Sequence, residues 1–425
     1  MRRDFGDFAN IAYYCTMKIL HTSDWHLGKH LQNFPRHPEQ QDVLQEICEI
    51  AEREHINVVI IAGDLFDTFN PPIESTELFY KTLKRLANNG KRAVIAIAGN
   101  HDSPDRIEAP DPLARECGIL FAGYPNTVVS PFKLESGLEV TQSEPGFIEL
   151  KIPDVNDFLR ILMTPYANEF RLKTYLGQED SEEELRTVLQ HKWTETAKKY
   201  CDNQGVNILL SHLLLMKKGD ELPEEPEDEK PILHVGGAQA IYSENIPDEI
   251  QFTALGHLHR KQTVDIQRNS NIYYSGSPLS YSFSEANQKK FVLLAEIEPG
   301  QKASIQEIEL KKGKRLLRKR SESIGEALEW LIENPDTLVE LTMSTDTYLT
   351  ADERKQLNAA HDGIVSLIPD VKNRGDRNDS NLKAIDLTKS MEALFIDYFK
   401  QAKGQEPNEN ILNLFKEVLS EEEAQ

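Results

Sequence analysis

The chain has 425 residues, of which 39% are hydrophobic and 28% are charged, enough apolar material for the cores of two or three domains. This composition excludes a wholly disordered chain. The formal net charge of −22 excludes a protein that grips nucleic acid through a broadly basic surface. Any contact with a polyanion must therefore be local, through metal ions or through one basic patch.

The sequence predicts neither a membrane span nor an export signal. The longest apolar candidate, Ile208–Met216, is shorter than the roughly 18 residues that a span requires. Asp4 and Asp7 fall where a secretory signal peptide needs an apolar core. The cysteines lie far apart and form no CxxC pair, which is typical of a reducing compartment. We therefore expect a cytoplasmic protein without membrane contact.

The first predicted strand is Lys18–His21, and residues 1–16 before it show no periodicity that ties them to a core. We interpret residues 1–16 as a dispensable extension, such as an alternative translation start would produce. Beyond them, strand-like runs alternate with helical patterns at His37–Glu54 and Glu74–Asn88, at steps of about 35 to 40 residues. This alternation predicts an α/β layered domain over residues 17–285. The other predicted strands of this domain are Val58–Ala62, Ala93–Ala98, Arg160–Met163, Asn207–Leu210, Phe252–Leu255 and Asn271–Tyr274.

A second pattern, over residues 286–372, predicts a small α+β capping domain. Its helical runs are Ile324–Glu333 and Asp352–His361. Residues 373–386 begin with a polar, apolar-poor stretch and predict a linker. The predicted strands of the capping domain are Phe291–Glu298, Ser304–Leu310, Thr337–Ser344 and Gly363–Leu367.

The tail, residues 387–425, places apolar side chains at helical spacing on two segments that Gly404 and Pro407 separate. The pattern predicts a helix–loop–helix. Two interpretations remain open: the apolar faces pack on the chain's own core, or they bury themselves in a partner. The preceding linker favours the partner, because a tethered helix pair reaches another molecule.

Five short polar motifs each follow a predicted strand. In open α/β sheets ligands gather at the carboxyl ends of strands, so motifs at these positions are expected to meet in one crevice. Their carboxylate, amide and imidazole groups are all metal ligands. Each motif alone is weak, because a single His or a Gly–Asp pair is ordinary turn chemistry. The motifs are Asp24-Trp25-His26, Gly63-Asp64-Leu65-Phe66-Asp67, Gly99-Asn100-His101-Asp102, Ser211-His212 and Gly256-His257-Leu258-His259.

The order of these motifs resembles that of the calcineurin-like metallophosphoesterases. The longer stretches His21–Gly28, Ala98–Ser103, Ser275–Leu279 and Ser282–Glu285 resemble the SbcD family, nuclease subunits that pair with the coiled-coil ATPase SbcC. The resemblance covers roughly residues 17–290 and continues beyond them in architecture only. It implies a two-sheet sandwich flanked by helices, then the capping domain, which binds DNA, then a helix–loop–helix that docks the ATPase coiled coil.

The resemblance also implies two divalent cations and favours Mn²⁺, whereas the residue types alone are compatible with Mn, Fe or Zn. The implied ligands are Asp24, His26, Asp64 and His259 for one ion, and Asp64, Asn100, His212 and His257 for the other. Asp64 is shared, because one carboxylate holds two cations at the ~3.5–4 Å spacing of two-metal sites.

His101 lies outside this ligand set. The resemblance assigns it to stabilising the transition state or protonating the leaving group. Asp102 follows it directly, and we expect its carboxylate to orient the His101 imidazole. The alternative for His101 is a turn residue behind the site.

Other features stay open at this level. Trp25 either stacks on a base or packs beside the site. Lys311–Arg320, with seven basic residues in ten, either touches a DNA backbone or forms a solvated hairpin. His30 and Asp67 lie near the motifs without an assigned role.

The leading hypothesis is a metal-dependent nuclease of double-strand ends, single strands and hairpins. It acts with an SbcC-like ATPase in DNA end processing, replication and recombination, as a homodimer within a nucleoid-associated heterotetramer. One alternative is a metallophosphoesterase of nucleotides or other small phosphodiesters, which needs neither the capping domain nor the tail. Another is a structural adaptor with a vestigial metal site, which a complete ligand set disfavours.

Overall fold

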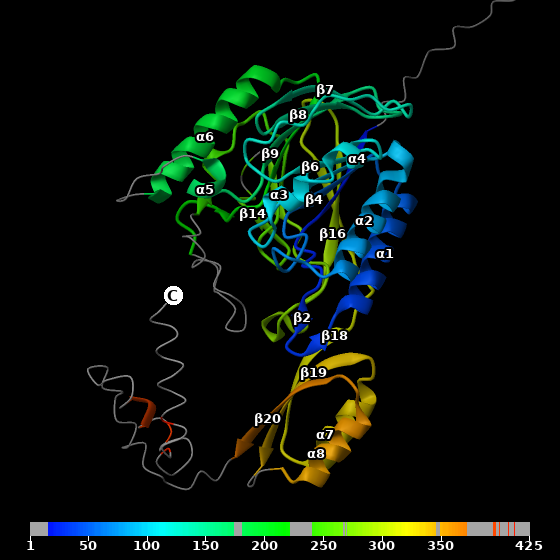
Figure 1. The fold of residues 1–425 in the computed structure, drawn as a ribbon, viewed down its shortest axis with the longest axis vertical. Helices are drawn as coiled ribbons and strands as arrows, with labels where there is room; N and C mark the ends of the chain where they lie inside the picture. Colours follow the sequence, from blue (N-terminus) through cyan, green and yellow to red (C-terminus); the bar gives the residue numbers. More distant parts are fainter. Residues whose placement is uncertain are drawn as a thin grey trace, which may run out of the picture. The chain divides into compact units, whose positions relative to one another are not determined.

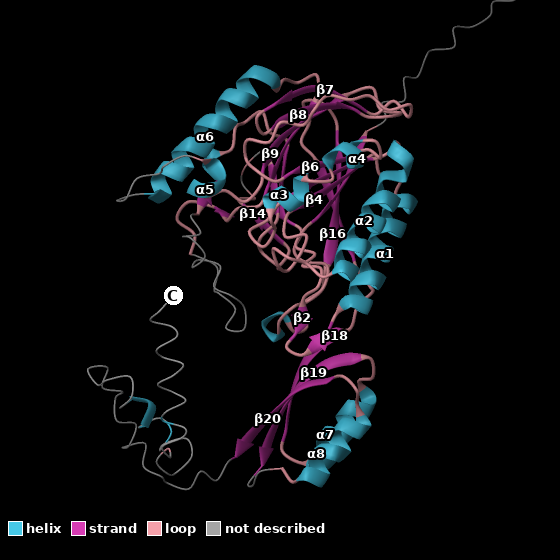
Figure 2. Cartoon of the chain, in the orientation of Figure 1, coloured by secondary structure: helices cyan, strands magenta, loops and turns pink. Residues whose placement is uncertain are grey.

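Two β-sheets stacked face to face form the centre of the fold (Figure 1, Figure 2). The computed structural model describes residues 16–173, 181–221, 240–266, 268, 270–345, 349–371, 394–396, 399, 407 and 412. The predicted N-terminal extension (except Thr16), the predicted linker and nearly all of the predicted helix–loop–helix lie outside the described residues.

The first sheet has six strands in the order β17-β16-β1-β4-β5-β6. Strands β1, β4, β5 and β6 pair in parallel, whereas β16 pairs antiparallel with β1 and with β17. Strands β4 and β5 are buried at every position, which explains their uninterrupted apolar sequence. The bounds are β1 Met17–Thr22, β4 Val58–Ala62, β5 Ala93–Ile97, β6 Ile119–Ala122, β16 Phe291–Ile297 and β17 Ser304–Glu309.

The second sheet has seven strands in the order β14-β15-β13-β10-β9-β8-β7. Its central strands β9, β10, β13 and β15 are parallel, and antiparallel strands lie on both sides of them. The bounds are β7 Glu139–Glu144, β8 Phe147–Lys151, β9 Phe158–Thr164, β10 Val206–Ser211, β13 Phe252–Leu255, β14 Gln262–Val264 and β15 Asn271–Tyr274.

Helices cover the outer face of each sheet. Helices α1 (His37–Arg53) and α2 (Ile73–Ala87) share a buried cluster with the first sheet, and α6 (Ser181–Tyr200) shares one with the second. A third cluster fills the space between the sheets. These layers confirm the predicted sandwich flanked by helices. The shorter elements are β2 His30–Leu31, β3 Phe34–Pro35, β11 Leu215–Met216, β12 Ile241–Tyr242, α3 Pro104–Glu108, α4 Asp111–Arg115, α5 Glu169–Leu172, and the 3₁₀ turns Asn88–Gly90, Ser243–Asn245 and Phe283–Glu285.

A separate three-stranded sheet, in the order β18-β19-β20, carries the predicted α+β pattern together with α7 and α8. The predicted domain boundary between residues 285 and 286 is wrong. Strands β16 and β17 complete the first sheet through β1, because the β16 side chains Leu293 and Ala295 are buried there. The bounds are β18 Arg315–Ser321, α7 Ile324–Glu333, β19 Thr337–Thr345, α8 Ala351–Ala360 and β20 Ile364–Val371.

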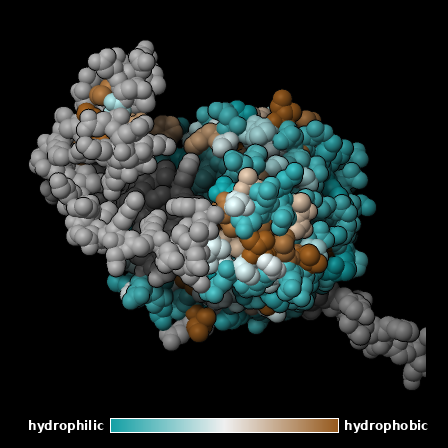
Figure 3. Space-filling view, turned by 90° about the horizontal axis from the view of Figure 1, so that it is seen from below, coloured by the Kyte–Doolittle hydropathy of each residue, from teal (hydrophilic) through white to brown (hydrophobic). Residues whose placement is uncertain are grey.

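The described surface is largely polar. Hydrophilic residues predominate over the described part of the face in Figure 3, and hydrophobic residues appear there in small groups. None of the described helices combines the length and the apolar composition that a membrane-spanning helix requires.

Deleting residues 1–16 is expected to leave the melting temperature and the phosphodiesterase rate unchanged. The first strand begins at Met17, which is fully buried, whereas Thr16 contributes an exposed hydrogen bond of 3.1 Å to Glu298. Exposed hydrogen bonds of this kind add little to stability. Differential scanning calorimetry of the two chains checks the prediction, and a drop of several degrees would show that the deleted stretch packs on the sheet.

Candidate metal centre

The five polar motifs converge at one edge of the sandwich. Each follows the carboxyl end of a parallel strand, where ligands bind in α/β sheets. Strands β1, β4 and β5 of the first sheet, and β10 and β13 of the second, contribute one motif each. The two sheets therefore supply the centre jointly.

Several of the predicted ligands have a left-handed backbone conformation, which residues other than glycine rarely adopt. The φ angles are +53° at Asp24, +43° at His26, +49° at Asp64 and +100° at His257. Each such residue costs of order 1–3 kcal/mol, and strain of this kind persists where function requires it. Its concentration at the motifs makes this edge of the sandwich the candidate functional site.

The glycines that precede the ligands are required by close packing. A Cβ atom on Gly99 would lie 2.1 Å from Asp64 Oδ1, and one on Gly63, whose φ is +86°, would lie 2.3 Å from His212 Nδ1. In both cases the space of a side chain is taken by a predicted ligand from another motif. The Gly–Asp and Gly–Asn pairs are therefore part of the site's construction rather than ordinary turns.

The rings of His26 and His259 approach each other edge-on through their Nε2 atoms. Their Nε2 atoms are 2.9 Å apart, and His26 Nε2 is 3.5 Å from Asp64 Oδ2. The opposite ring nitrogens face carboxylates, with His26 Nδ1 3.5 Å from Asp67 and His259 Nδ1 3.6 Å from Glu285. A hydrogen on Nδ1, directed toward its carboxylate, would leave the Nε2 lone pair for a cation, as in metal-binding histidines. Two lone pairs and a carboxylate oxygen thus meet where a cation fits.

His212 approaches the same oxygen of Asp64, Oδ2, through its own Nε2. Its Nδ1 lies 2.7 Å from the Ala62 carbonyl oxygen, which only accepts, so Nδ1 carries the hydrogen. In the neutral ring Nε2 then directs a lone pair at Asp64 Oδ2 (3.3 Å) and at Asn100 Oδ1 (3.0 Å). Asn100 Oδ1 is also 3.1 Å from His257 Nδ1. This second convergence of acceptors again suits a cation.

All seven predicted ligands are thus brought together, and His101 lies beside them. Three groups of side chains at the centre each have their potential ligand atoms within 4.8 Å of one another, and Asp64 belongs to two of these groups. Asn100 and His257 lie next to these groups: Asn100 Oδ1 contacts His212 and His257, and the backbone N–H of His257 donates to Asp24 at 2.8 Å. The three groups are Asp24–His26–His259, His26–Asp64–His101 and Asp24–Asp64–His212.

Burial and mutual charge shift the pKa values at the centre. Burial lowers the pKa of His257 to about 3 and that of His26 to about 4, so both rings are neutral, as metal ligands must be. Burial raises the pKa of Asp24 to about 6. Burial alone would lower the pKa of His212, but the charge and hydrogen bond of Asp64, the charge of Asp24 and the hydrogen bond to the Ala62 carbonyl together outweigh it and raise that pKa to about 9. A cation bound at His212 takes the place of that proton.

His101 lies at the rim, partly exposed. Its backbone N–H donates to Asp64 Oδ1 at 2.9 Å, and its Nδ1 is 2.9 Å from the carbonyl oxygen of Asp67. Because that oxygen only accepts, Nδ1 carries the hydrogen. The Nε2 atom of His101 therefore remains to give or take a proton.

The expectation that Asp102 orients His101 is wrong. The Asp102 carboxylate is fully buried and accepts the backbone N–H groups of Leu65 at 3.0 Å, Phe66 at 2.9 Å and Gly99 at 2.8 Å. It thereby ties the loop after β4 to the loop after β5. Asp102 positions two ligand-bearing loops, and the carbonyl of Asp67 orients His101.

Sequence reasoning missed Arg171 on α5. The guanidinium is buried and donates to the carbonyl oxygens of Gly99 at 2.7 Å and Asp102 at 2.8 Å, on either side of Asn100 and His101. No motif surrounds Arg171 in the sequence, so no signal marked it. Sequence reasoning also missed that the carboxylates of Asp67 and Glu285 lie beside the rings of His26 and His259, although both residues belong to motifs named in the sequence analysis.

The two remaining residues singled out in the sequence lie apart from the chemistry. Trp25 is fully buried and its indole N–H donates to Thr22 Oγ1 at 3.0 Å, so it packs in the core and does not stack on a base. His30 is exposed, with its ring 3.1 Å from the Gly28 carbonyl oxygen.

Replacing Asp102 with Ala is expected to lower the free energy of unfolding by about 3 kcal/mol or more. The change leaves three buried backbone N–H groups without an acceptor, and each unpaired group costs about 1–3 kcal/mol. Chemical denaturation measures the loss, with Asp42→Ala on the exposed face of α1 as the control, expected to stay within about 0.5 kcal/mol. An Asp102→Ala protein with full stability but no turnover would instead place Asp102 in the chemistry.

The family model and the curated relatives agree on one family. The family model described as calcineurin-like phosphoesterase matches residues 17–261. The D subunit of the SbcCD nuclease of Bacillus subtilis (strain 168) is 36% identical over 95% of this chain and 98% of that protein. The corresponding protein of Rhodobacter capsulatus is 30% identical over 67% of each chain. Among solved structures, TT1561 of Thermus thermophilus is 11% identical over 69% of this chain and 99% of that one, with a TM-score of 0.37.

Proposed function

Because the chain belongs to the SbcD family of calcineurin-like phosphoesterases, we propose that it is the nuclease subunit of an SbcCD-type complex. At the coarser level it is a metal-dependent hydrolase of phosphodiester bonds. The observation that carries the proposal is the convergence of imidazole nitrogens and carboxylates around Asp64. Such an arrangement is unfavourable without cations and suits two of them.

In the proposed assignment, one cation is held by Asp24, His26, Asp64 and His259. The other is held by Asp64 together with Asn100, His212 and His257. Bound divalent cations supply an activated water at neutral pH and neutralise charge on the phosphodiester. Mn²⁺ is the proposed metal, because the resemblance to the SbcD family favours it among the ions that oxygen and imidazole ligands bind.

His101 is proposed to handle the proton of the leaving group. Its Nδ1–H is fixed by the Asp67 carbonyl, so the ring presents Nε2 in a set orientation. When protonated, Nε2 donates a hydrogen bond or a proton to the departing oxygen. The peptide hydrogen bond from His101 to Asp64 ties this ring to the shared carboxylate.

The proposed substrate is DNA, at double-strand ends and at single-stranded or hairpin positions, in end processing, replication and recombination at the nucleoid. Labelled duplex and hairpin DNA are incubated with the full chain and Mn²⁺, beside free nucleotides and p-nitrophenyl diesters. Cleavage of DNA with a much higher kcat/KM than for the small diesters supports the proposal. A preference for nucleotides or small diesters would favour the alternative enzyme, and no turnover at all would favour an adaptor.

The tail is proposed to dock an SbcC-like ATPase, with the nuclease as a homodimer in a heterotetramer. A chain that ends at Asn378 is expected to retain Mn²⁺-dependent DNA cleavage but to lose co-purification with that ATPase, because the apolar helix faces that fit a groove are gone. A pull-down with the co-expressed ATPase measures binding. Full-affinity binding by the truncated chain would place the docking surface elsewhere.

A further inference from the structure

The loop that follows β5, Gly99–Asp102, carries two residues of the metal centre, and we call it the β5 loop. Asn100 Oδ1 lies 3.1 Å from His257 Nδ1 at one of the two proposed metal positions. The backbone N–H of His101 donates to Asp64 Oδ1 at 2.9 Å. The position of the β5 loop therefore determines where the Asn100 amide oxygen and the His101 ring lie.

The guanidinium of Arg171 on α5 spans the two ends of the β5 loop. Its Nη1 donates to the carbonyl oxygen of Gly99 at 2.7 Å, and its Nη2 donates to the carbonyl oxygen of Asp102 at 2.8 Å. Its Cζ atom lies over the ring of Tyr166, 5.1 Å from the ring centroid. A planar guanidinium presents paired donors in a rigid geometry. Arg171 therefore sets the distance between the two carbonyl groups that enclose Asn100 and His101.

Stability alone does not explain a charged side chain at this place. Arg171 is only 5% exposed, and among the described residues its partners are peptide oxygens and the Tyr166 ring, with no carboxylate in an ion pair. A buried charge without a counter-ion is unfavourable, and an apolar side chain of similar length would avoid that penalty. The arginine is better explained by the position that it gives to the β5 loop.

The start of α5 is fixed by two hydrogen bonds. The side chain of Asn168, the N-cap residue, accepts the backbone N–H of Arg171 at 2.9 Å. The backbone N–H of Tyr166 donates to the carbonyl oxygen of Ala98, directly before the β5 loop, at 3.0 Å. Because α5 follows β9 of the second sheet, these contacts hold the β5 loop of the first sheet against the second sheet.

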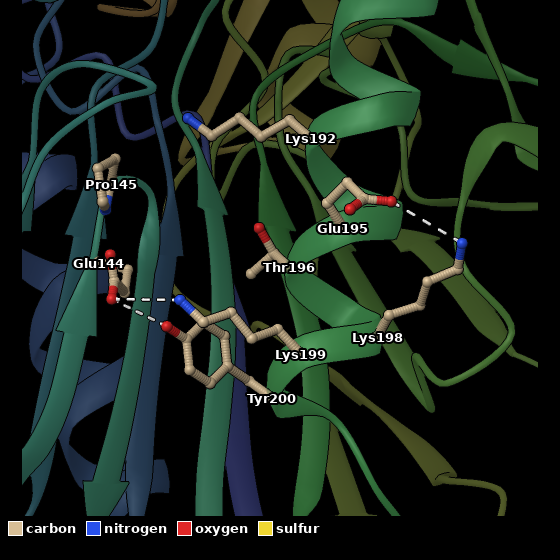
Figure 4. A pocket seen from close by; sticks show the side chains of 8 residues that line it. All are labelled: Glu144, Pro145, Lys192, Glu195, Thr196, Lys198, Lys199 and Tyr200. Atoms are coloured by element: carbon tan, nitrogen blue, oxygen red, sulfur yellow. Dashed lines mark hydrogen bonds and ion pairs between the residues drawn. The ribbon is translucent and has the colours of Figure 1, made fainter.

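The end of α5 is linked to a hollow of about 530 Å³ between α6 and the end of β7 (Figure 4). Two lysines of this hollow form ion pairs with the glutamates drawn beside them. Lys192 instead donates to Asn126 Oδ1 at 2.6 Å, and Asn126 Nδ2 donates to the carbonyl oxygen of Leu172 at 3.5 Å. The hollow thus provides an anchor for the helix that carries Arg171.

Resting on the proposed nuclease function, we infer that Arg171 is a positioning residue of the metal centre. It holds the β5 loop so that Asn100 reaches the cation at His212 and His257, and so that His101 is placed for the leaving group. Arg171 acts through these two residues rather than on the substrate. Its removal is therefore expected to affect one cation and turnover, but not the affinity for DNA.

The test compares Arg171→Met with Arg92→Met in the full chain. Arg92 is a matched control, because its buried guanidinium also donates to backbone carbonyl oxygens, but at the amino end of β5, away from the centre. Calorimetric titration of the metal-free chains with Mn²⁺ measures the two binding steps. Steady-state cleavage of a labelled duplex at saturating Mn²⁺ separates kcat from KM. The oxygens bound by Arg92 are those of Ala51, Ile56 and Leu86.

In Arg171→Met, the affinity of one Mn²⁺ binding step is expected to fall about 10–100-fold while the other step stays at the wild-type level. The value of kcat is expected to fall by about 10–100-fold, because a small displacement of a reacting group is enough for such a loss. KM for DNA stays at the level of Arg92→Met. The Arg92→Met chain keeps both binding steps and its kcat, and only its melting temperature falls.

Two further variants separate geometry from charge and from folding. Arg171→Lys retains the charge without the paired donors, so it is expected to behave as Arg171→Met does. Asn168→Ala removes the N-cap of α5 and leaves the guanidinium in the chain, so smaller changes in the same binding step and in kcat are expected. If Arg171→Met lacks a cooperative melting transition, Asn168→Ala decides the question.

Three outcomes would overturn the inference. Wild-type Mn²⁺ binding and kcat in a folded Arg171→Met chain would show that the β5 loop holds its position without the guanidinium. Equal losses in Arg92→Met would assign the effect to general stability. Full recovery in Arg171→Lys would assign it to charge. A wild-type chain that binds two Mn²⁺ ions but cleaves no DNA would overturn the proposed function alone, because the binding steps still test Arg171.

Discussion

Replacing Asp64 with Ala is expected to remove both cations from the centre and to abolish turnover. Asp64 Oδ2 lies 3.5 Å from His26 Nε2 and 3.3 Å from His212 Nε2, so the carboxylate belongs to both proposed positions. Metal content after dialysis, measured by inductively coupled plasma mass spectrometry, is expected to fall from about two ions per chain to nearly none.

The matched control for this variant is His259→Ala, which removes a ligand of one position only. It is expected to retain about one ion per chain, since two-metal sites lose one ion when an unshared ligand is removed. Circular dichroism establishes that both variants fold. One ion retained by the Asp64→Ala protein would contradict the shared role of this carboxylate.

Replacing His101 with Asn is expected to lower kcat by about 10²–10⁴-fold while metal content stays unchanged. The ring lies beside the predicted ligands, and its free Nε2 is the group that asparagine cannot replace. Steady-state kinetics and metal analysis of the same preparation separate the two effects. His30→Asn, at an exposed ring outside the centre, is the control and is expected to behave as wild type. If His101→Asn loses metal as readily as turnover, His101 is a ligand or a structural residue.

Local pattern predicted the elements that position the site. The buried run Val58–Ala62 is a strand in the structure with the predicted bounds, because a fully apolar run between turn motifs has few other solutions. The ligand motifs follow such strands, so their meeting at one edge follows from the parallel topology. The seven predicted ligands were accordingly found together.

Long-range pairing was beyond the reach of the sequence. The sequence pattern predicted that β16 starts a new domain, yet this strand pairs with β1, more than 250 residues earlier in the chain. Asp102 beside His101 suggested a side-chain contact, but its carboxylate instead binds three peptide groups from two loops. Arg171 acts through backbone carbonyls, which leave no mark in the sequence around it. Contacts of this kind depend on the tertiary fold rather than on local residue spacing.

The central claim is that one centre binds two cations that share Asp64. Anomalous diffraction from crystals of the full chain soaked with Mn²⁺ tests it most directly. The account predicts two peaks about 3.5–4 Å apart, with Asp64 between them, His26 and His259 on one and His212 and His257 on the other. A single peak, or two peaks without Asp64 in common, would contradict it.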